Sequence, residues 1–218
     1  MNTAKRRAAR RQTRRLSQLL VRERELWDAG VQRVAGVDEA GVGPLAGPVV
    51  AAAVIFHPGE GLRGVDDSKR LTSSRRETLA VEIRARALAY SVVRVEPAEI
   101  DAMNILQASL AAMRRALRSL PASPEHVLVD GRAIPGVDLP QETWIKGDAR
   151  CHAIAAASIL AKTSRDAWMV DYDADFPGYG FAEHKGYPTA NHREALRRLG
   201  PTPIHRRSFA LPQRALWD

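Results

Sequence analysis

The chain has 218 residues, of which 45% are hydrophobic and 27% are charged, and these values exclude a wholly disordered or fibrous protein. Its single cysteine, Cys151, excludes an internal disulfide and suits a reducing cytoplasm. The formal net charge of +8 is confined to residues 1–24, which hold nine Lys and Arg and one acid. The rest of the chain is balanced, with 24 basic and 24 acidic residues.

The N-terminal segment is predicted to be a basic tail. Residues 1–13 are small and basic and favour disorder, and residues 16–29 have a helical spacing that stops at Gly30. We expect residues 1–24 to form a flexible tail and residues 25–218 to form one domain, with about residues 176–218 as a C-terminal appendage. The tail is either a sequence-independent contact to nucleic acid, which we favour, or a solubilising extension.

Residues 40–59 contain no charged side chain, which raises the question of a membrane span. Seven of these twenty residues are glycine or proline, and they would interrupt a spanning helix repeatedly. The segment therefore predicts a loop followed by a buried strand. No apolar core follows the basic N-terminus, as a secretory signal would require. We expect a soluble, cytoplasmic protein with no membrane partner.

Predicted strands and helices alternate along the rest of the chain. The strands are expected over residues 34–38, 48–57, 90–96, 126–130 and 142–146. Helices are expected up to about residue 88, over residues 97–120, whose apolar positions step by three or four, and over residues 151–169. A glycine- and proline-rich loop, a short helix and a basic end follow. This alternation predicts an α/β domain.

Four carboxylates stand at or near the ends of predicted strands: Asp38, Glu39, Asp130 and Asp148. Ligands bind at the carboxyl ends of strands in such domains, and unpaired buried carboxylates are costly. Oxygen ligands suit Mg²⁺ or Mn²⁺, and a pair of such ions can clamp a phosphoryl displacement. The alternative is turn chemistry. Adjacent strand residues also point to opposite faces, so Asp38 and Glu39 converge only if the strand ends or twists between them.

Seven motifs between about Val34 and Phe209 resemble, in the same order, those of the bacterial ribonuclease HII family of type 2 ribonucleases H. They are GVDEAGVGPLAGPVVAAAVI, DDSKRLT, VLVDGR, KGDA, AAASILAKTSRD, YGFAEHKGYPT and GPTPIHRRSF. The resemblance implies an RNase H-like fold with a central mixed β-sheet flanked by helices and a small C-terminal helical extension. It also implies that Asp38, Glu39, Asp130 and Asp148 are the catalytic and metal-binding residues, holding two Mg²⁺ or Mn²⁺ ions.

The same resemblance implies the activity. The family cuts the RNA strand of RNA/DNA hybrids and the 5′ side of single ribonucleotides in duplex DNA, which would leave 5′-phosphate and 3′-hydroxyl ends. Implied substrate contacts are Gly41, Val42, Gly43, Ser68, Lys69 and Tyr187. The family loop usually reads Gly-Arg-Gly and recognises the ribose 2′-hydroxyl through its backbone. Val42 in place of Arg should cost a phosphate contact rather than recognition, and Gly43 is expected to need close approach and a positive φ.

Each implied substrate contact also has a purely structural explanation. The glycines could only shape a turn, Lys69 could be solvated, and Tyr187 could be a packing residue. Lys162 and Arg165 either reach phosphate or cover the surface of their helix. His184, His192 and His205 are assigned no catalytic step. Two other functions are kept open: a DNA nuclease of the same broad fold, and a catalytically inactive nucleic-acid-binding protein. We expect a monomer.

Overall fold

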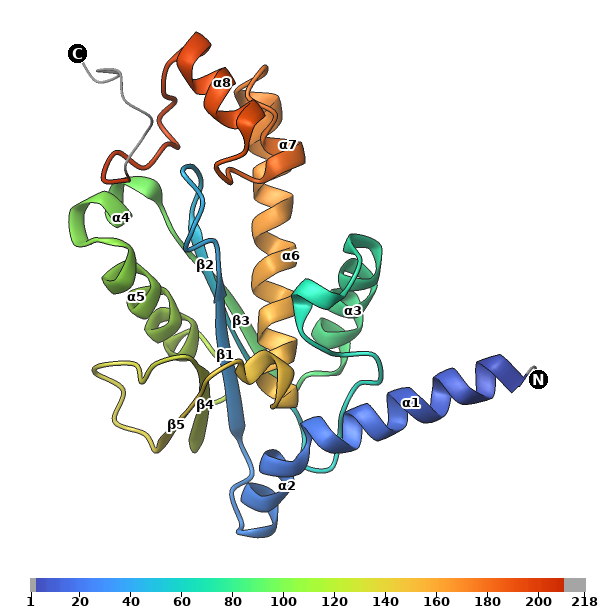
Figure 1. The fold of residues 1–218 in the computed structure, drawn as a ribbon. Helices are drawn as coiled ribbons and strands as arrows, with labels where there is room; N and C mark the ends of the chain where they lie inside the picture. Colours follow the sequence, from blue (N-terminus) through green and yellow to red (C-terminus); the bar gives the residue numbers. More distant parts are fainter. Residues whose placement is uncertain (1–2, 210–218) are drawn as a thin grey trace.

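The structure, a computed structural model, describes residues 3–209, and in that range five strands form one mixed sheet with the order β3-β2-β1-β4-β5 (Figure 1). The strands are β1 (Val34–Ala40), β2 (Val49–Ile55), β3 (Ala89–Val95), β4 (His126–Asp130) and β5 (Gln141–Trp144). β2 runs antiparallel to both β1 and β3, whereas β1, β4 and β5 run parallel to one another. The carboxyl ends of β1, β4 and β5 therefore lie at one edge of the sheet.

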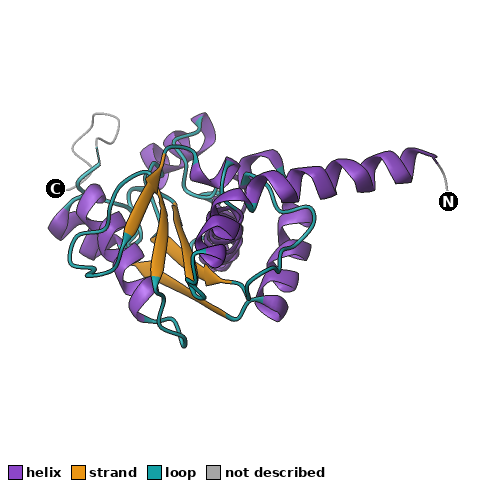
Figure 2. Ribbon diagram, turned by 90° about the horizontal axis from the view of Figure 1, so that it is seen from below, coloured by secondary structure: helices purple, strands orange, loops and turns teal. Residues whose placement is uncertain are grey.

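Helices cover both faces of this sheet (Figure 2). They are α1 (Thr3–Leu19), α2 (Val21–Asp28), α3 (Ser73–Arg86), α4 (Pro97–Met103), α5 (Ile105–Arg118), α6 (His152–Asp175), α7 (Phe181–His184) and α8 (Ala190–Leu199), with 3₁₀ turns η1 (Ser68–Arg70) and η2 (Gly147–Ala149). α5 packs on the face that carries Val49, Ala51 and Ala53, and α3 and α6 pack on the face that carries Val50 and Ala52. The predicted α/β fold with a central mixed sheet is confirmed.

β1 and β2 are buried on both sides because their side chains are small. All seven residues of β2 are fully buried, as expected for an apolar run without alternation. In β1, a Cβ atom at Gly36 would overlap the backbone of Ala153, so glycine lets α6 lie directly against the strand. This close packing brings the middle of α6, including Ser158, to the carboxyl end of β1.

The helix predicted over residues 97–120 is interrupted at Asn104. This residue has a φ of 72°, ends α4, and caps α5 through its side-chain oxygen, which accepts a hydrogen bond of 3.0 Å from the backbone N–H of Gln107. Asparagine tolerates the left-handed conformation and favours N-cap positions. The prediction was wrong here because the apolar spacing runs through the break without a glycine or proline to mark it.

The N-terminal predictions also need correction. Residues 3–13, expected to be disordered, form the first part of α1, because alanine, arginine and glutamine are good helix formers and no glycine or proline precedes Gly30. The helix expected over 16–29 is split into α1 and α2. Leu19, Leu20 and Glu23 are buried, and the Glu23 carboxylate accepts a 2.8 Å hydrogen bond from the N–H of Ala153. The packed domain thus begins before residue 25.

The C-terminal appendage packs on the second half of α6. Phe181 of α7 and Leu196 of α8 share a small apolar cluster with Met169 of α6 and Ala46, a residue of the loop between β1 and β2. The appendage is thereby joined to that loop, and this contact matters for the site below. In the described part of the chain, no helix is long and apolar enough to cross a bilayer.

Candidate active site

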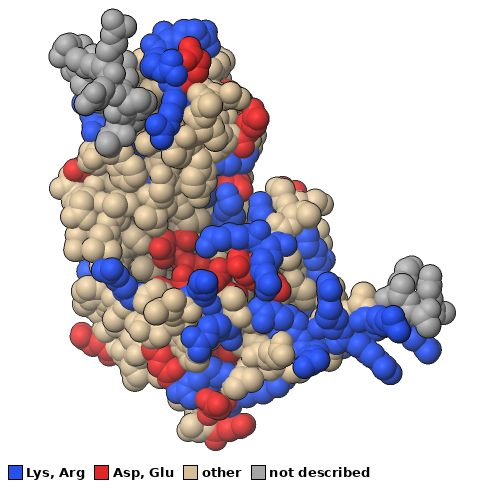
Figure 3. Space-filling view, in the orientation of Figure 1, with Lys and Arg blue, Asp and Glu red and all other residues tan. Residues whose placement is uncertain are grey.

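Three of the four predicted acids line a single groove at the carboxyl edge of the parallel strands. Asp38 and Glu39 lie near the end of β1, and Asp130 is the last residue of β4. The groove has a volume of about 250 Å³, and its wall also contains Gly41, Val42, Gly43, Ser68, Lys69, Ser158, Lys162 and Tyr187. In Figure 3 an acidic patch lies near the middle of the face shown and is bordered by cations.

Asp38 and Glu39 do point to opposite sides of the sheet. Asp38 is hydrogen-bonded to Ser158 of α6, and Glu39 is hydrogen-bonded to Ser109 of α5. Both nevertheless lie close enough to Asp130 for its charge to raise their pKa values. The parallel register pairs Val37 with Val129, so the acids that follow reach the strand ends at the same level. A strand break between the two acids is not needed for them to share the groove.

Asp148 reaches the cluster through the turn η2 rather than through a strand. Lys146, with a φ of 56°, turns the chain after β5, and the N–H of Gly147 then donates a 2.6 Å hydrogen bond to Oδ1 of Asp130. This bond ties η2 to the end of β4. Asp148 is buried, and burial together with the charges of Asp67 and Asp130 raises its pKa, while Lys69 opposes the rise.

The cluster is electrostatically strained. Burial, followed by the charges of Glu39 and Asp130, raises the pKa of Asp38 well above its ordinary value. Burial and the charge of Asp130 raise the pKa of Glu39 to about 7, although Lys69 favours its charged form. Repulsion of this kind is relieved by a bound cation, and an all-oxygen donor set fits Mg²⁺ or Mn²⁺. Among the described residues, no three His, Cys, Asp or Glu side chains are placed so that together they could hold one metal ion, so these acids are neighbours rather than a preformed single-ion site.

The predicted substrate contacts are gathered around these acids. Lys69 is exposed, and Tyr187 is 40% exposed with its ring 5.8 Å from Nζ of Lys162. Ser68 is buried at the base of the groove, where its hydroxyl lies 2.9 Å from that of Ser158, the residue bonded to Asp38. Ser68 therefore also supports Asp38, through Ser158.

One prediction about the glycine loop, residues 41–43, was wrong. The positive φ belongs to Gly41, at 92°, whereas Gly43 has no positive φ. A Cβ at Gly41 would also overlap the side chain of Arg165, while a Cβ at Gly43 would lie 3.9 Å from the Tyr187 ring, in ordinary contact. The two glycines thus have different roles: Gly41 permits the fold of the loop, and Gly43 leaves space at the groove beside Tyr187.

Two buried arginines hold this loop from behind. Arg206, from the basic C-terminal motif, donates hydrogen bonds to the carbonyl oxygens of Gly41, Val42 and Gly47 at 2.6, 3.1 and 2.9 Å. Arg165 of α6 donates to the carbonyl oxygens of three further residues at 2.9 to 3.1 Å, which are Ala46, Pro48 and Lys185. Both side chains are fully buried, so Arg165 neither reaches phosphate nor covers a helix surface, contrary to both predicted readings.

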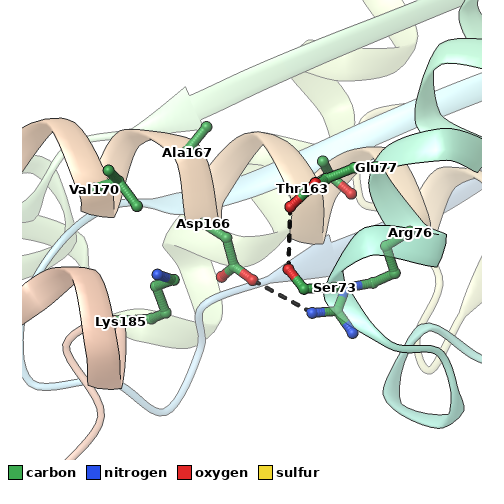
Figure 4. A pocket seen from close by; sticks show the side chains of 8 residues that line it. All are labelled: Ser73, Arg76, Glu77, Thr163, Asp166, Ala167, Val170 and Lys185. Atoms are coloured by element: carbon green, nitrogen blue, oxygen red, sulfur yellow. Dashed lines mark hydrogen bonds and ion pairs between the residues drawn. The ribbon is translucent and has the colours of Figure 1, made fainter.

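Lys162 is held at the rim of the groove by Asp166, whose carboxylate is 2.6 Å from Nζ. Asp166 also lies 3.7 Å from the guanidinium of Arg76, in a second cavity of about 210 Å³ between α3 and α6. Figure 4 shows Asp166 and Arg76 pointing toward each other across this cavity, with Lys185 on the opposite side of Asp166. The cavity is lined by two cations, Arg76 and Lys185, and by two acids, Glu77 and Asp166, so it lacks the net positive charge of an anion site.

His184, His192 and His205 support the loop that carries Tyr187. The N–H of Thr202 donates to Nδ1 of His205, so Nε2 of His205 carries the proton and donates to Nε2 of His192, 3.1 Å away. Nδ1 of His192 in turn donates to the carbonyl oxygen of Tyr187 at 3.0 Å. His184 stacks on His192 and binds the same loop through Gly186. These contacts give all three histidines structural partners, and their assignment to no catalytic step stays a prediction.

Sequence reasoning missed several residues that the structure places at the site. Ser109 and Ser158 support Glu39 and Asp38, and Arg206 holds the glycine loop. The two serines carried a signal, because each interrupts a small or apolar helix face with a hydroxyl. Arg206 carried none, since its neighbour Arg207 has the same side chain and only the fold buries one of them.

Comparison with known proteins shows the family of this chain. The family model for ribonuclease HII matches residues 35–211. The ribonuclease HII of Moorella thermoacetica is 55% identical over 203 residues, covering 93% of this chain and 98% of the relative. That of Myxococcus xanthus is 54% identical over 203 residues, covering 93% of this chain and 69% of the relative.

Solved structures give the same result. Ribonuclease H2 from Pyrococcus horikoshii has a TM-score of 0.70 at 31% identity, covering 81% of this chain and 93% of that one. A ribonuclease HII from Archaeoglobus fulgidus, solved as a complex with PCNA, has a TM-score of 0.70 at 29% identity, covering 84% of this chain and 97% of that one. Fold and site thus define an enzyme of the ribonuclease H class. Within that class, the chain belongs to the ribonuclease HII family.

Proposed function

We propose that this enzyme is a metal-dependent endonuclease that hydrolyses the RNA strand of RNA/DNA hybrids and cuts on the 5′ side of single ribonucleotides in duplex DNA. The observation that carries the proposal is the groove itself, where Asp38, Glu39 and Asp130 face the glycine loop and Tyr187 across about 250 Å³. Such an activity suits the removal of RNA primers and of misincorporated ribonucleotides in the cytoplasm.

Asp38, Glu39, Asp130 and Asp148 would hold two Mg²⁺ or Mn²⁺ ions, because they are the clustered oxygen donors whose mutual repulsion a cation relieves. When bound, such ions supply the charge that favours deprotonation of the attacking water and stabilises the leaving 3′-oxygen. The chain's own residues position the acids: Ser158 and Ser109 orient Asp38 and Glu39, and Gly147 fixes Asp130. The products would be 5′-phosphate and 3′-hydroxyl ends.

Recognition of the ribonucleotide is assigned to the loop Gly41–Gly43 and to Tyr187. The 2′-hydroxyl is the group that distinguishes RNA from DNA at one nucleotide, and a backbone N–H or carbonyl can bind it. Arg206 donates hydrogen bonds to the carbonyl oxygens of Gly41 and Val42, so the loop is held with fixed geometry beside the groove. Tyr187 offers a half-exposed ring on which a base or sugar can stack, and Lys69 lies where a phosphate would enter.

The test is cleavage of labelled duplexes that carry one ribonucleotide, a full RNA strand, or DNA only, with Mg²⁺ or Mn²⁺ and then with EDTA. We expect cleavage of the first two substrates, dependence on the metal, and no cleavage of the all-DNA duplex. Cutting of the all-DNA duplex would instead support a DNA nuclease of the same fold. Salt-sensitive binding without any metal-dependent cleavage would support a catalytically inactive nucleic-acid-binding protein.

A further inference from the structure

The helix α1 carries an unusual concentration of positive charge. Its seventeen residues contain no acid, and Arg6, Arg7, Arg10, Arg11 and Arg14 are all exposed. Among the residues that the structure describes, Arg15 is the one arginine of α1 with an acidic partner. The helix projects from the domain, as Figures 1 and 2 both show.

Arg15 anchors this helix beside the active site. Its guanidinium is hydrogen-bonded to Asp66 and donates a 2.9 Å bond to the carbonyl oxygen of Ala149, the residue that follows Asp148. Despite partial burial, the hydrogen bond from Arg15 helps to lower the pKa of Asp66, so the ion pair is maintained at neutral pH. α1 therefore leaves the domain at the turn that carries one of the four acids.

A basic surface connects α1 to the groove. Arg11 and Arg15 of α1 line a cavity of about 680 Å³ together with Arg70 and Arg75, and Arg70 follows directly on Lys69 of the groove. Figure 3 shows the same continuity, with cations that run from the acidic patch to the right along α1. Asp66 also lines this cavity, where it is paired with Arg15 and lies 3.9 Å from Arg70, so one acid faces several arginines.

The arginines of α1 repel one another. Arginines stand four residues apart at positions 6 and 10, 7 and 11, 10 and 14, and 11 and 15, and like charges at this spacing destabilise a helix. Residues 6–14 of α1 are all exposed, so none of them buries a side chain that would compensate for this repulsion. Phosphates along the helix would both relieve the repulsion and complement the surface.

We propose that α1 is an arm that binds the phosphate backbone of the duplex on one side of the cleavage site. The inference rests on the proposed function, because the duplex must enter the groove for its continuation to meet α1. With seventeen residues, the helix is about 25 Å long, which corresponds to about 7 base pairs of duplex. The arm therefore raises the affinity of the enzyme for duplexes that are longer on one side of the cleavage site, whatever the sequence of the duplex.

The experiment measures binding, in EDTA, to duplexes with one central ribonucleotide. Either the 5′ or the 3′ flank is extended in steps from about 4 to about 12 base pairs, so that one flank grows past the length of α1. The variant is R10Q/R11Q, which leaves the anchor Arg15 in place. The matched control is R114Q/R118Q, which removes two arginines from α5, on the face of the sheet opposite α6. A separate assay with Mg²⁺ measures cleavage.

We expect the parent and the control to bind about tenfold more tightly as one flank is extended, and R10Q/R11Q to lose most of this gain. Its salt slope should fall by about 1.8, because two phosphate contacts are lost. An equal gain with length in the variant, or a loss of affinity independent of flank, would overturn the proposal. Binding is measured without metal, so it tests the arm independently of cleavage. Absence of cleavage by the parent would contradict the proposed function but would not change the conclusion from the binding data.

Discussion

The guanidinium of Arg206 donates a hydrogen bond of 2.6 Å to the carbonyl oxygen of Gly41, from 165 residues away in the chain. Gly41 opens the loop that faces the groove, and Arg206 belongs to the last described segment. The C-terminal appendage thus supports the loop proposed to recognise the ribonucleotide, since it supplies the donor that fixes the loop from its buried side.

We therefore expect R206Q to impair selectivity as well as stability. It leaves the carbonyls of Gly41, Val42 and Gly47 without their donor, at about 1–3 kcal/mol for each buried group left unpaired. Kinetics on duplexes with one ribonucleotide or none, below the melting temperature, should show a smaller preference for the ribonucleotide. R206K, which keeps the charge, should recover part of it. A lower melting temperature with an unchanged preference for the ribonucleotide would show that Arg206 only stabilises the fold.

The two glycines of the loop should respond differently to alanine. G41A forces a methyl group toward Arg165 at a φ of 92°, so we expect a loss of stability on thermal unfolding. G43A should leave the melting temperature nearly unchanged, because its methyl would make only ordinary contact with Tyr187. Its cleavage of a single-ribonucleotide duplex should nevertheless fall about tenfold or more, since the methyl enters the space left for the ribose. Normal cleavage by G43A would move recognition elsewhere.

Val42→Arg restores the side chain usual in the family. Val42 is 39% exposed and lines the groove, so an arginine there can reach phosphate without repacking the core. We expect tighter binding and a steeper salt dependence, by about one unit of slope for one phosphate contact. The requirement for a 2′-hydroxyl should be unchanged. If V42R created a ribonucleotide preference that the parent lacks, recognition through the backbone would be refuted.

Asp130→Asn tests the acid cluster. The amide oxygen can still accept the hydrogen bond from Gly147, so folding should survive. The charge that lies between Asp38, Glu39 and Asp148 is lost, and cleavage with Mg²⁺ should fall by about a hundredfold or more. The measurements are single-turnover cleavage and thermal unfolding. Near-normal turnover by folded D130N protein would remove Asp130 from the proposed metal site.

The stability of the enzyme should fall below about pH 6.5 because of three of its buried histidines, which are His152 and the contacting pair His192 and His205. Burial lowers the pKa of each to about 4, so the unfolded state binds more protons between about pH 6.5, the ordinary pKa of histidine, and pH 4. The stabilisation is complete above pH 6.5 and is lost as the pH falls through this window.

The measurement for this pair is the melting temperature between pH 7.5 and pH 5, for the parent and for His205→Asn. The parent curve should drop more steeply on acidification. Glu23, whose pKa burial raises to about 7, has the opposite pH dependence but is present in both proteins, so it cancels in the comparison. Parallel curves would show that His205 does not contribute to the loss of stability in this window.

The sequence by itself determined the alternating α/β elements and singled out the four acids as candidates. Strands such as residues 49–55 are uniformly apolar, and carboxylates directly after such runs stand out because burial without a partner is costly. Motif order then led to the family. These features are local in the chain, so they can be recognised without coordinates.

The tertiary structure decided what brings distant segments together. It placed Asp38 and Glu39 on opposite sides of β1 yet next to Asp130, which depends on the parallel register of β1 and β4. It buried Arg206 rather than leaving it on the surface, because the loop carbonyls that it pairs with lie more than 150 positions away. Strand order, register and burial are properties of contacts between segments, and no single segment carries them in its own sequence.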